Sequence, residues 1–304
     1  MSSAQKRMYA MEVIQEGSIS YNVPTLLKVE GEIDLKVLEA AFGKLCDRHE
    51  LLRTHFMHSN DNFVQIVEET VKAKVTYEEV NGIKEKELLD GFVQPFDLSK
   101  APLMKMKVVK NLSNKTSYLL IDVHHIICDG ESLAIIFDEL SKLYNGIPLA
   151  PIKVQYKNYS AWESKRNIDS QKKSWMNEFE NGVTPLELRT DFNRPAWRSS
   201  NGDSFNTMIK EELTAAIKEF CKKTKTTEYM FLMAAFMTSL HKYSHQKEII
   251  LGTPIAGRTH PDTQNMLGMF VNTLAIKGEI DEKHSFLQFL NSIKEKCLKG
   301  YENQ

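Results

Sequence analysis

Short apolar runs alternate with helical patterns along the whole chain, and this alternation constrains the fold more than any other feature. Apolar or alternating runs of five to nine residues are typical of strands. They occur at Thr25–Val29, Phe63–Val67, Leu103–Val109 and Tyr118–Val123, and again at Phe205–Ile209, Ile249–Pro254 and Met269–Ile276. The sequence shows no internal repeat and no low-complexity tract. The pattern predicts a mixed α/β protein.

Helical periodicity fills the segments between these runs. Asp34 is a candidate N-cap for a helix whose apolar face carries Leu38, Phe42 and Leu45. A second helix follows the strand at Tyr118–Val123 and stops at Gly146. Later helical segments are a polar one carrying Trp162 and Trp175, then Glu211–Lys223, Thr227–Tyr243, which reads as largely buried, and His284–Leu298. A Pro-interrupted connection spans Ile147–Tyr156, and a loop region surrounds Arg189–Gly202.

Length and composition fit two globular lobes. The 304 residues correspond to about two units of roughly 150 residues each. Hydrophobic residues make up 42% and charged residues 26%, enough for a large core. Because both halves mix strands and helices, we expect two α/β lobes that meet at an interface, a usual place for a binding site.

Charge and cysteine content exclude several classes of function. A net charge of −1 argues against a nucleic-acid-binding protein, which needs a basic face. No apolar run approaches the roughly 20 residues that span a bilayer, and no secretory signal opens the chain. The four cysteines form no Cys-x-x-Cys pair, which argues against zinc and redox-dithiol sites. We therefore expect a cytoplasmic protein without membrane or nucleic-acid partners.

The run His124-His125-Ile126-Ile127-Cys128-Asp129-Gly130 is the strongest candidate for chemistry. Side chains alternate along a strand, so adjacent histidines should point in opposite directions, which argues against a shared metal ion. Gly130 leaves room for a close approach of backbone or substrate. A structural explanation stays open, because a histidine pair at a strand end is more often structural, Asp129 can simply cap the next helix, and Cys128 reads as packing.

This run and four others resemble the motifs of one family. His-His-x-x-x-Asp-Gly is the signature of the condensation domains of nonribosomal peptide synthetases, a superfamily that includes chloramphenicol-acetyltransferase-like enzymes. The other matching elements, in family order, are Ser2-Ser-Ala-Gln-Lys-Arg-Met-Tyr9, Arg48-His-Glu-Leu-Leu-Arg-Thr-His-Phe56, Tyr156-Lys-Asn-Tyr-Ser-Ala-Trp162 and Leu267-Gly-Met-Phe-Val-Asn-Thr-Leu274. Asn158 departs from the pattern, where the family usually has an acidic residue.

The resemblance implies an architecture. We expect two chloramphenicol-acetyltransferase-like lobes in a V-shaped pseudo-dimer with the active site at their interface. The N-terminal lobe would span residues 1–165 and carry the histidine run, and an incomplete C-terminal lobe would span 166–304. The family's sixth motif would begin near Asn303-Gln304 and the seventh is absent, so we expect a chain truncated at its C-terminus and uncertain in activity.

The resemblance also implies a reaction and residue roles. In the family an acceptor amine on one carrier protein attacks the thioester of a donor on another, forming a peptide bond. His125 is then the catalytic residue, as base or as the group that orients the amine. His124 is buried and structural, and Gly130 shapes the site. Asp129 pairs with Arg258 of Gly252-Thr-Pro-Ile-Ala-Gly-Arg258, where a bidentate contact suits a rigid structural role, and Asn272 is a cleft-lining candidate.

Partners and alternatives follow from the same resemblance. We expect upstream and downstream peptidyl carrier proteins, an adjacent adenylation domain and a setting in secondary metabolism such as antibiotic biosynthesis. No cofactor binds directly, since the substrates ride on phosphopantetheine arms. The motifs favour an L-configured donor. The alternatives are a related acyltransferase, an epimerisation domain, or a non-catalytic fragment that docks carrier proteins.

Overall fold

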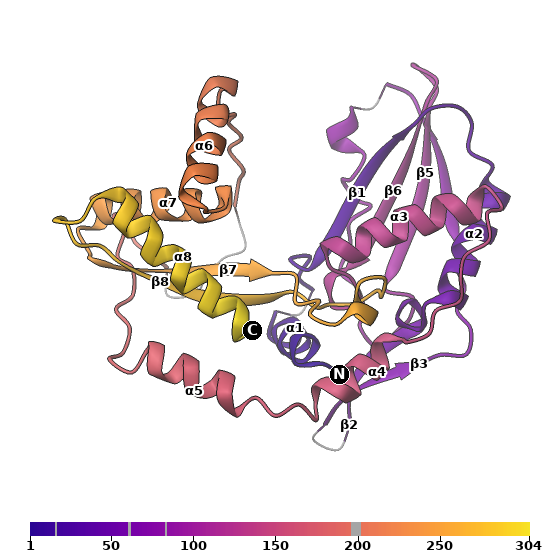
Figure 1. The fold of residues 1–304 in the computed structure, drawn as a ribbon. Coiled ribbons are helices and arrows are strands. Elements are labelled where there is room, and N and C mark those ends of the chain that lie inside the picture. The colour runs from indigo at the N-terminus through magenta and orange to yellow at the C-terminus, as the bar shows by residue number, and fades with distance from the viewer. Residues whose placement is uncertain (16, 60–61, 83, 196–201) are drawn as a thin grey trace. The chain divides into compact units, whose positions relative to one another are not determined.

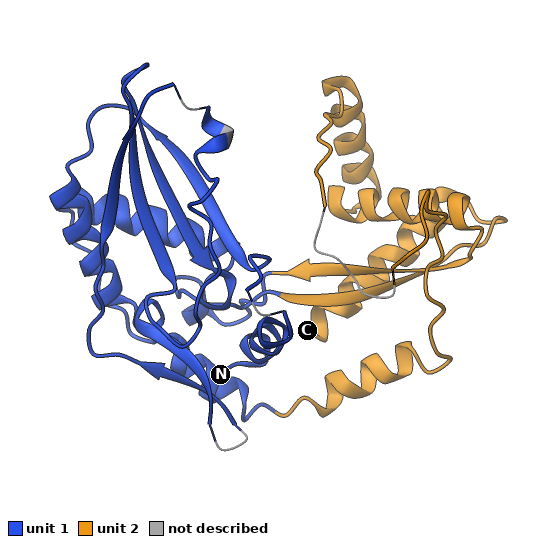
Figure 2. Cartoon of the chain, turned by 180° about the vertical axis from the view of Figure 1, so that it is seen from behind, with its two compact units in different colours: residues 1–166, 256–271 blue, residues 167–255, 272–304 orange. Residues whose placement is uncertain are grey.

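The chain forms two compact units, which Figure 2 distinguishes by colour. The structure, a computed structural model, describes residues 1–15, 17–59, 62–82, 84–195 and 202–304. Unit 1 comprises Met1–Arg166 and Ala256–Val271, and unit 2 comprises Asn167–Ile255 and Asn272–Gln304. The segment Ala256–Val271 therefore packs with unit 1, although the chain on both sides of it belongs to unit 2. Each unit combines helices with a sheet, which confirms the predicted mixed α/β class.

Unit 1 is built on a four-stranded sheet. Its strands, in spatial order, are β1 (Asn22–Val29), β6 (Thr116–His124), β5 (Met104–Asn111) and β4 (Val75–Val80). β6 pairs antiparallel with both neighbours, whereas β4 and β5 are parallel. The register sets Asn22 opposite His124 at the end of β6. A separate antiparallel pair consists of β2 (Thr54–Ser59) and β3 (Asn62–Val67).

Helices α2 (Leu35–Arg48) and α3 (Gly130–Tyr144) cover one face of this sheet (Figure 1). The Asp34 side chain accepts hydrogen bonds from the amides of Lys36 and Val37 and so fixes the start of α2, as predicted. On β6, Leu119, Ile121 and Val123 belong to the same apolar cluster as the buried residues of the two helices. Tyr118 and Leu120 belong to a smaller cluster. Alternation then assigns Asp122 and His124 to the face of the smaller cluster.

Short elements complete unit 1. Helix α1 (Ser3–Ile14) begins with a capping box, in which the Ser2 hydroxyl accepts from the Gln5 amide and the Gln5 side chain accepts from the Ser2 amide. The remaining elements are α4 (Tyr156–Glu163) and the 3-10 helices η1 (Glu50–Arg53), η2 (Glu85–Glu87), η3 (His125–Ile127) and η4 (Pro261–Thr263). These short elements connect α1, the end of β6 and the segment Ala256–Val271.

Unit 2 pairs two strands with a helical layer. Strands β7 (Glu248–Ile255) and β8 (Asn272–Glu279) are antiparallel. Its helices are α5 (Asp169–Glu178), α6 (Glu211–Thr224), α7 (Glu228–Ser244) and α8 (Phe286–Glu302). The predicted methionine stripe Met230, Met233 and Met237 packs in the same apolar cluster as Leu290 and Ile293. None of the described helices is both long and apolar enough to cross a membrane.

Several predicted elements are wrong. Phe205–Ile209 is not a strand: Phe205 and Met208 are each 93% exposed, because no strand among the described residues pairs with this segment. The polar helix carrying both tryptophans is two helices, α4 and α5, and Trp162 is 46% exposed rather than in the core. Residues 196–201 of the predicted loop at Arg189–Gly202 lie outside the described residues.

Two helix and strand assignments needed smaller corrections. Helix α7 is buried on one side only, since Leu232 and Phe236 are exposed. The strand predicted from Met269 begins at Asn272, because Met269 and Phe270 use backbone groups in side-chain hydrogen bonds. Strands β2 and β4 and helix α1 were not predicted.

The packing of α2 on the sheet predicts a large effect of a single truncation. We expect Phe42→Ala to lower the free energy of unfolding of unit 1 by about 3–5 kcal/mol, because this ring is fully buried. Val37→Ala on the same helix, where the side chain is 39% exposed, should cost less than about 1 kcal/mol. Hydrogen exchange of the β5 and β6 amides would measure both. Equal losses would contradict the assignment of Phe42 to the core.

Candidate active site

Strand β6 ends at His124, and the next residue begins a tight turn. His124 is fully buried, and its Nδ1 accepts a hydrogen bond of 3.1 Å from the Ile126 amide. In a neutral imidazole with Nδ1 as acceptor, the proton must lie on Nε2. The predicted opposition of the two histidines rested on strand alternation, but His125 already belongs to η3. Strand geometry therefore does not set the direction of the His125 ring.

The backbone of His125 is fixed at both ends. Its amide donates to the Tyr21 carbonyl at 2.8 Å, and its carbonyl accepts from the Cys128 amide at 3.2 Å. The side chain is partly exposed, while its Nδ1 is buried and has no hydrogen-bond partner among the described residues. Nε2 is thus the ring nitrogen that can reach a substrate.

Asp129 follows the turn as the N-cap of α3. Its Oδ1 accepts from the Ser132 amide at 2.8 Å and from the Ser132 hydroxyl at 2.7 Å. A Cβ atom added at Gly130 would meet no atom within 4 Å, so the space beside this residue is open. Burial raises the pKa of the Cys128 thiol, which agrees with a packing role and not with a thiolate nucleophile.

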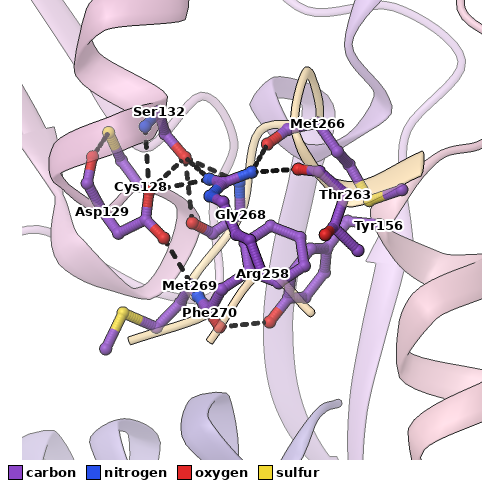
Figure 3. Close-up of polar contacts among 10 residues, drawn as sticks. All are labelled: Cys128, Asp129, Ser132, Tyr156, Arg258, Thr263, Met266, Gly268, Met269 and Phe270. Atoms are coloured by element: carbon purple, nitrogen blue, oxygen red, sulfur yellow. Dashed lines mark hydrogen bonds and ion pairs between the residues drawn. The ribbon is translucent and has the colours of Figure 1, made fainter. Parts of the chain in front are cut away.

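Arg258 reaches the same carboxylate from the segment Ala256–Val271 (Figure 3). Its Nη2 donates to Asp129 Oδ1 at 2.9 Å and to Ser132 Oγ at 3.0 Å. Its Nη1 donates to the carbonyls of Thr263 and Met266. The contact with Asp129 is single rather than the expected bidentate pair, because the second guanidinium nitrogen is used within its own loop. Both side chains are almost fully buried.

Further hydrogen bonds hold this loop to the rest of unit 1. The Phe270 amide donates to Asp129 Oδ2 at 3.2 Å, and the Gly268 amide donates to Ser132 Oγ at 3.0 Å. The Tyr156 hydroxyl donates to the Met269 carbonyl at 2.6 Å (Figure 3). Sequence reasoning gave no role to Ser132 or Tyr156. Ser132 stands three residues after a capping aspartate, a spacing that could have indicated it.

A second polar group lies on the same face of β6 as His124. Asn22 donates from Nδ2 to Asp122 Oδ2 at 2.7 Å, and Lys105 is paired opposite Asp122 on β5. Burial raises the pKa of Asp122 and lowers that of Lys105, although each moderates the other's shift. Both Asn22 and Lys105 also donate to the Gln94 carbonyl. The sequence analysis did not identify this group.

Buried polar atoms without a partner concentrate around the end of β6. Among the described residues, seven buried side-chain atoms have no hydrogen-bond partner. Five of them belong to Glu12, Asn22, Asp122, His124 and His125. Such atoms are rare in folded proteins and mark sites where polar chemistry takes place. Within the described residues, no group of three or more His, Cys, Asp or Glu side chains is placed to hold a metal ion.

The remaining predicted site residue lies in unit 2. Asn272 is the first residue of β8, opposite Ile255 of β7, and is partly buried. The contacts of unit 1 bring together His124, His125, Asp129, Gly130 and Arg258 around η3 and the start of α3. The role of Asn272 as a cleft residue stays a prediction.

Comparisons with known proteins agree with this site. A family model described as "Condensation domain" matches residues 1–304. The chain is 41% identical over 308 residues to gramicidin S synthase 2 of Aneurinibacillus migulanus, covering 100% of this chain and 7% of that protein. The chain therefore spans only a small part of the curated relatives that it matches.

Solved structures share the fold. A four-domain nonribosomal peptide synthetase, holo-AB3403, matches with a TM-score of 0.88 and 21% identity over 100% of this chain and 24% of that one. The first condensation domain of the CDA synthetase matches with a TM-score of 0.82 and 16% identity over 100% of this chain and 74% of that one. At these identities the likeness shows the fold alone.

The buried ion pair makes Asp129 sensitive to loss of charge. We expect Asp129→Asn to lower the free energy of unfolding of unit 1 by about 3–5 kcal/mol, because Arg258 would stay buried without a counter-charge. Asp34→Asn changes an exposed helix cap in the same way and should cost about 0.5 kcal/mol or less. Urea unfolding followed by hydrogen exchange in α3 would compare them. Two equally small losses would show that the ion pair does not hold the loop.

His124 predicts a pH dependence of stability. Burial, with a smaller contribution from His125, lowers its pKa to about 4. The unfolded chain protonates this histidine near pH 6.5, so the folded state loses stability as the pH falls from about 6.5 towards 4, in total about 3 kcal/mol. Substitution His124→Gln should flatten this part of the stability profile, whereas His260→Gln, at an exposed position, should leave it unchanged. Parallel profiles for wild type and His124→Gln would contradict the shift.

Proposed function

The chain belongs to the condensation-domain family, and from that premise we propose that it forms a peptide bond between two carrier-protein-bound substrates. The acceptor is an aminoacyl group with a free amine, and the donor is an aminoacyl or peptidyl thioester with an L-configured residue. The observation that carries the proposal is the turn η3. It presents a partly exposed His125 on a backbone fixed by Tyr21 and Cys128, next to the buried Asp129–Arg258 pair.

The chemistry needs one mobile proton. The acceptor nitrogen attacks the thioester carbonyl carbon, a C–N bond forms, and the C–S bond then breaks to release a thiolate. The proton lost by nitrogen passes to Nε2 of His125 and from there to the leaving sulfur. An imidazole in this position contributes about 10²–10⁴-fold. The Nδ1 of His125 is buried, so only Nε2 is available for the transfer.

Positioning supplies the remainder of the rate. A thioester is already reactive, so holding amine and carbonyl together accounts for much of the acceleration. The substrates arrive on the phosphopantetheine arms of carrier proteins, and the domain itself binds no cofactor. His125, not His124, is the catalytic residue, because His124 is buried and its Nδ1 is used by the backbone.

The partners follow from the multidomain relatives. Gramicidin S synthase 2, which this chain resembles, is far longer than the matched region. We propose that upstream and downstream peptidyl carrier proteins deliver the substrates and that an adenylation domain is adjacent. A cytoplasmic setting agrees with four buried, unpaired cysteines.

Substitution of the proposed base tests the function. In the full-length protein with loaded donor and acceptor carrier proteins, we expect His125→Ala to reduce dipeptidyl product by about 10²-fold or more, because the attacking nitrogen loses its proton acceptor. Product on the acceptor carrier would be measured by intact-protein mass spectrometry. The control His284→Ala removes a histidine that is 56% exposed in unit 2 and should leave turnover unchanged.

The same assay separates the alternatives. Undiminished product from His125→Ala would overturn the catalytic assignment. Wild-type protein that inverts the donor α-carbon, or that accepts acyl groups only from coenzyme A, would show an epimerisation domain or a free acyltransferase instead. Carrier binding without any turnover would indicate a docking function.

A further inference from the structure

The buried face of His124 opposite its backbone contact points towards Glu12 of helix α1. The Nε2 of His124 lies 3.9 Å from Glu12 Oε2, and both atoms are buried without another hydrogen-bond partner among the described residues. Leaving a buried polar atom unpaired costs about 1–3 kcal/mol, so two such atoms facing one another have a strong reason to pair. Their separation exceeds a hydrogen bond by about 1 Å, a gap that a small change in the Glu12 torsions closes.

The direction of this contact is set by the other ring nitrogen. Because Nδ1 of His124 accepts from the Ile126 amide, the proton of the neutral ring lies on Nε2. Nε2 is therefore a donor, and Glu12 Oε2 is the acceptor. Burial raises the pKa of Glu12 and lowers that of His124, which disfavours charge on either group, and a carboxyl oxygen accepts in both of its protonation states.

No other side chain competes for Nε2 in the described surroundings of His124. The rings of Tyr21 and Phe96 pack against the imidazole at centroid distances of 6.1 and 5.9 Å. Asp122 lies on the same face of β6, but its Oδ2 is used by Asn22. His125 faces the ring as a like-charged neighbour when protonated. Glu12 is the one carboxylate within 4 Å of this nitrogen among the described residues.

Helix α1 holds the turn at a second point. Gln5 donates from Nε2 to the Ile126 carbonyl at 3.2 Å. The Ile126 amide is bound by His124, so both sides of this residue are connected to α1, one directly and one through the imidazole. Ile126 follows His125 immediately. A helix that fixes Ile126 in this way also fixes the orientation of the His125 backbone.

We propose that Glu12 is a positioning residue for the reaction at His125: its carboxyl group accepts the Nε2–H of His124 and holds the η3 turn in its productive orientation. The inference rests on the proposed function, because it assigns the turn's purpose to the chemistry at His125. Glu12 does not touch the substrate. It acts through His124, as carboxylates that orient histidines do elsewhere.

The test compares three variants. Glu12→Leu removes the acceptor, Glu12→Gln keeps an acceptor oxygen of the same shape, and Glu30→Leu removes an exposed glutamate as the control. We expect Glu12→Leu to lower kcat about tenfold, the equivalent of one lost hydrogen bond, with KM for the loaded carriers unchanged. Glu12→Gln should restore kcat to within about twofold of wild type, and Glu30→Leu should match wild type.

A spectroscopic measurement tests the contact without turnover. In protein labelled with 15N-histidine, His124 should show the Nε2–H tautomer, with a protected Nε2 proton in wild type and in Glu12→Gln. The proton should exchange rapidly in Glu12→Leu. Thermal unfolding identifies any variant that fails to fold, and the Gln variant then carries the comparison.

The outcomes separate the two hypotheses. Full kcat in Glu12→Leu, or an equal loss in Glu12→Gln, overturns the positioning role. A Nε2 proton that is equally protected in Glu12→Leu overturns the contact itself. If wild type gives no condensation product, the proposed function fails, and the imidazole signal still decides whether Glu12 accepts from His124.

Discussion

The contact between Asp129 and Arg258 holds the rest of the site in place. One carboxylate caps α3, receives the guanidinium and accepts the Phe270 amide. Burying such a pair repays its desolvation only when the remaining hydrogen-bonding groups are also satisfied, and here the Thr263 and Met266 carbonyls take the other guanidinium nitrogen. The pair thus fixes a loop to a helix start, and because α3 follows η3 directly, it also limits where the catalytic turn can lie.

The turn is therefore held from two directions that are far apart in the sequence. Asp129 fixes its C-terminal side, while α1 binds Ile126 through Gln5 and faces His124 with Glu12. Between these anchors stands His125, the side chain that stays partly exposed and keeps a ring nitrogen available. Rigid surroundings and one accessible imidazole suit a reaction in which the reactants are already activated and mainly need correct placement.

Local patterns predicted the elements whose causes are local. Helix α2 was predictable because Asp34 caps it and Leu38, Phe42 and Leu45 share a face. Phe205–Ile209 has the alternation of a strand, yet a strand also needs a partner, and none of the described strands pairs with it. Met269 and Phe270 look like strand residues, but Tyr156 and Asp129 take their backbone groups. Competition of that kind is invisible to periodicity.

The site shows the same division between residue types and contacts. The histidine run and the candidate partner Arg258 were recognisable by motif, and their spacing of 129 residues is closed only by the fold. Glu12 carried no signal, because it stands on an unpredicted helix and its meaning comes from His124, whose free nitrogen is known only once Ile126 is seen to occupy the other. A motif names the residue that reacts, whereas the residues that orient it emerge from counting which buried donors still lack an acceptor.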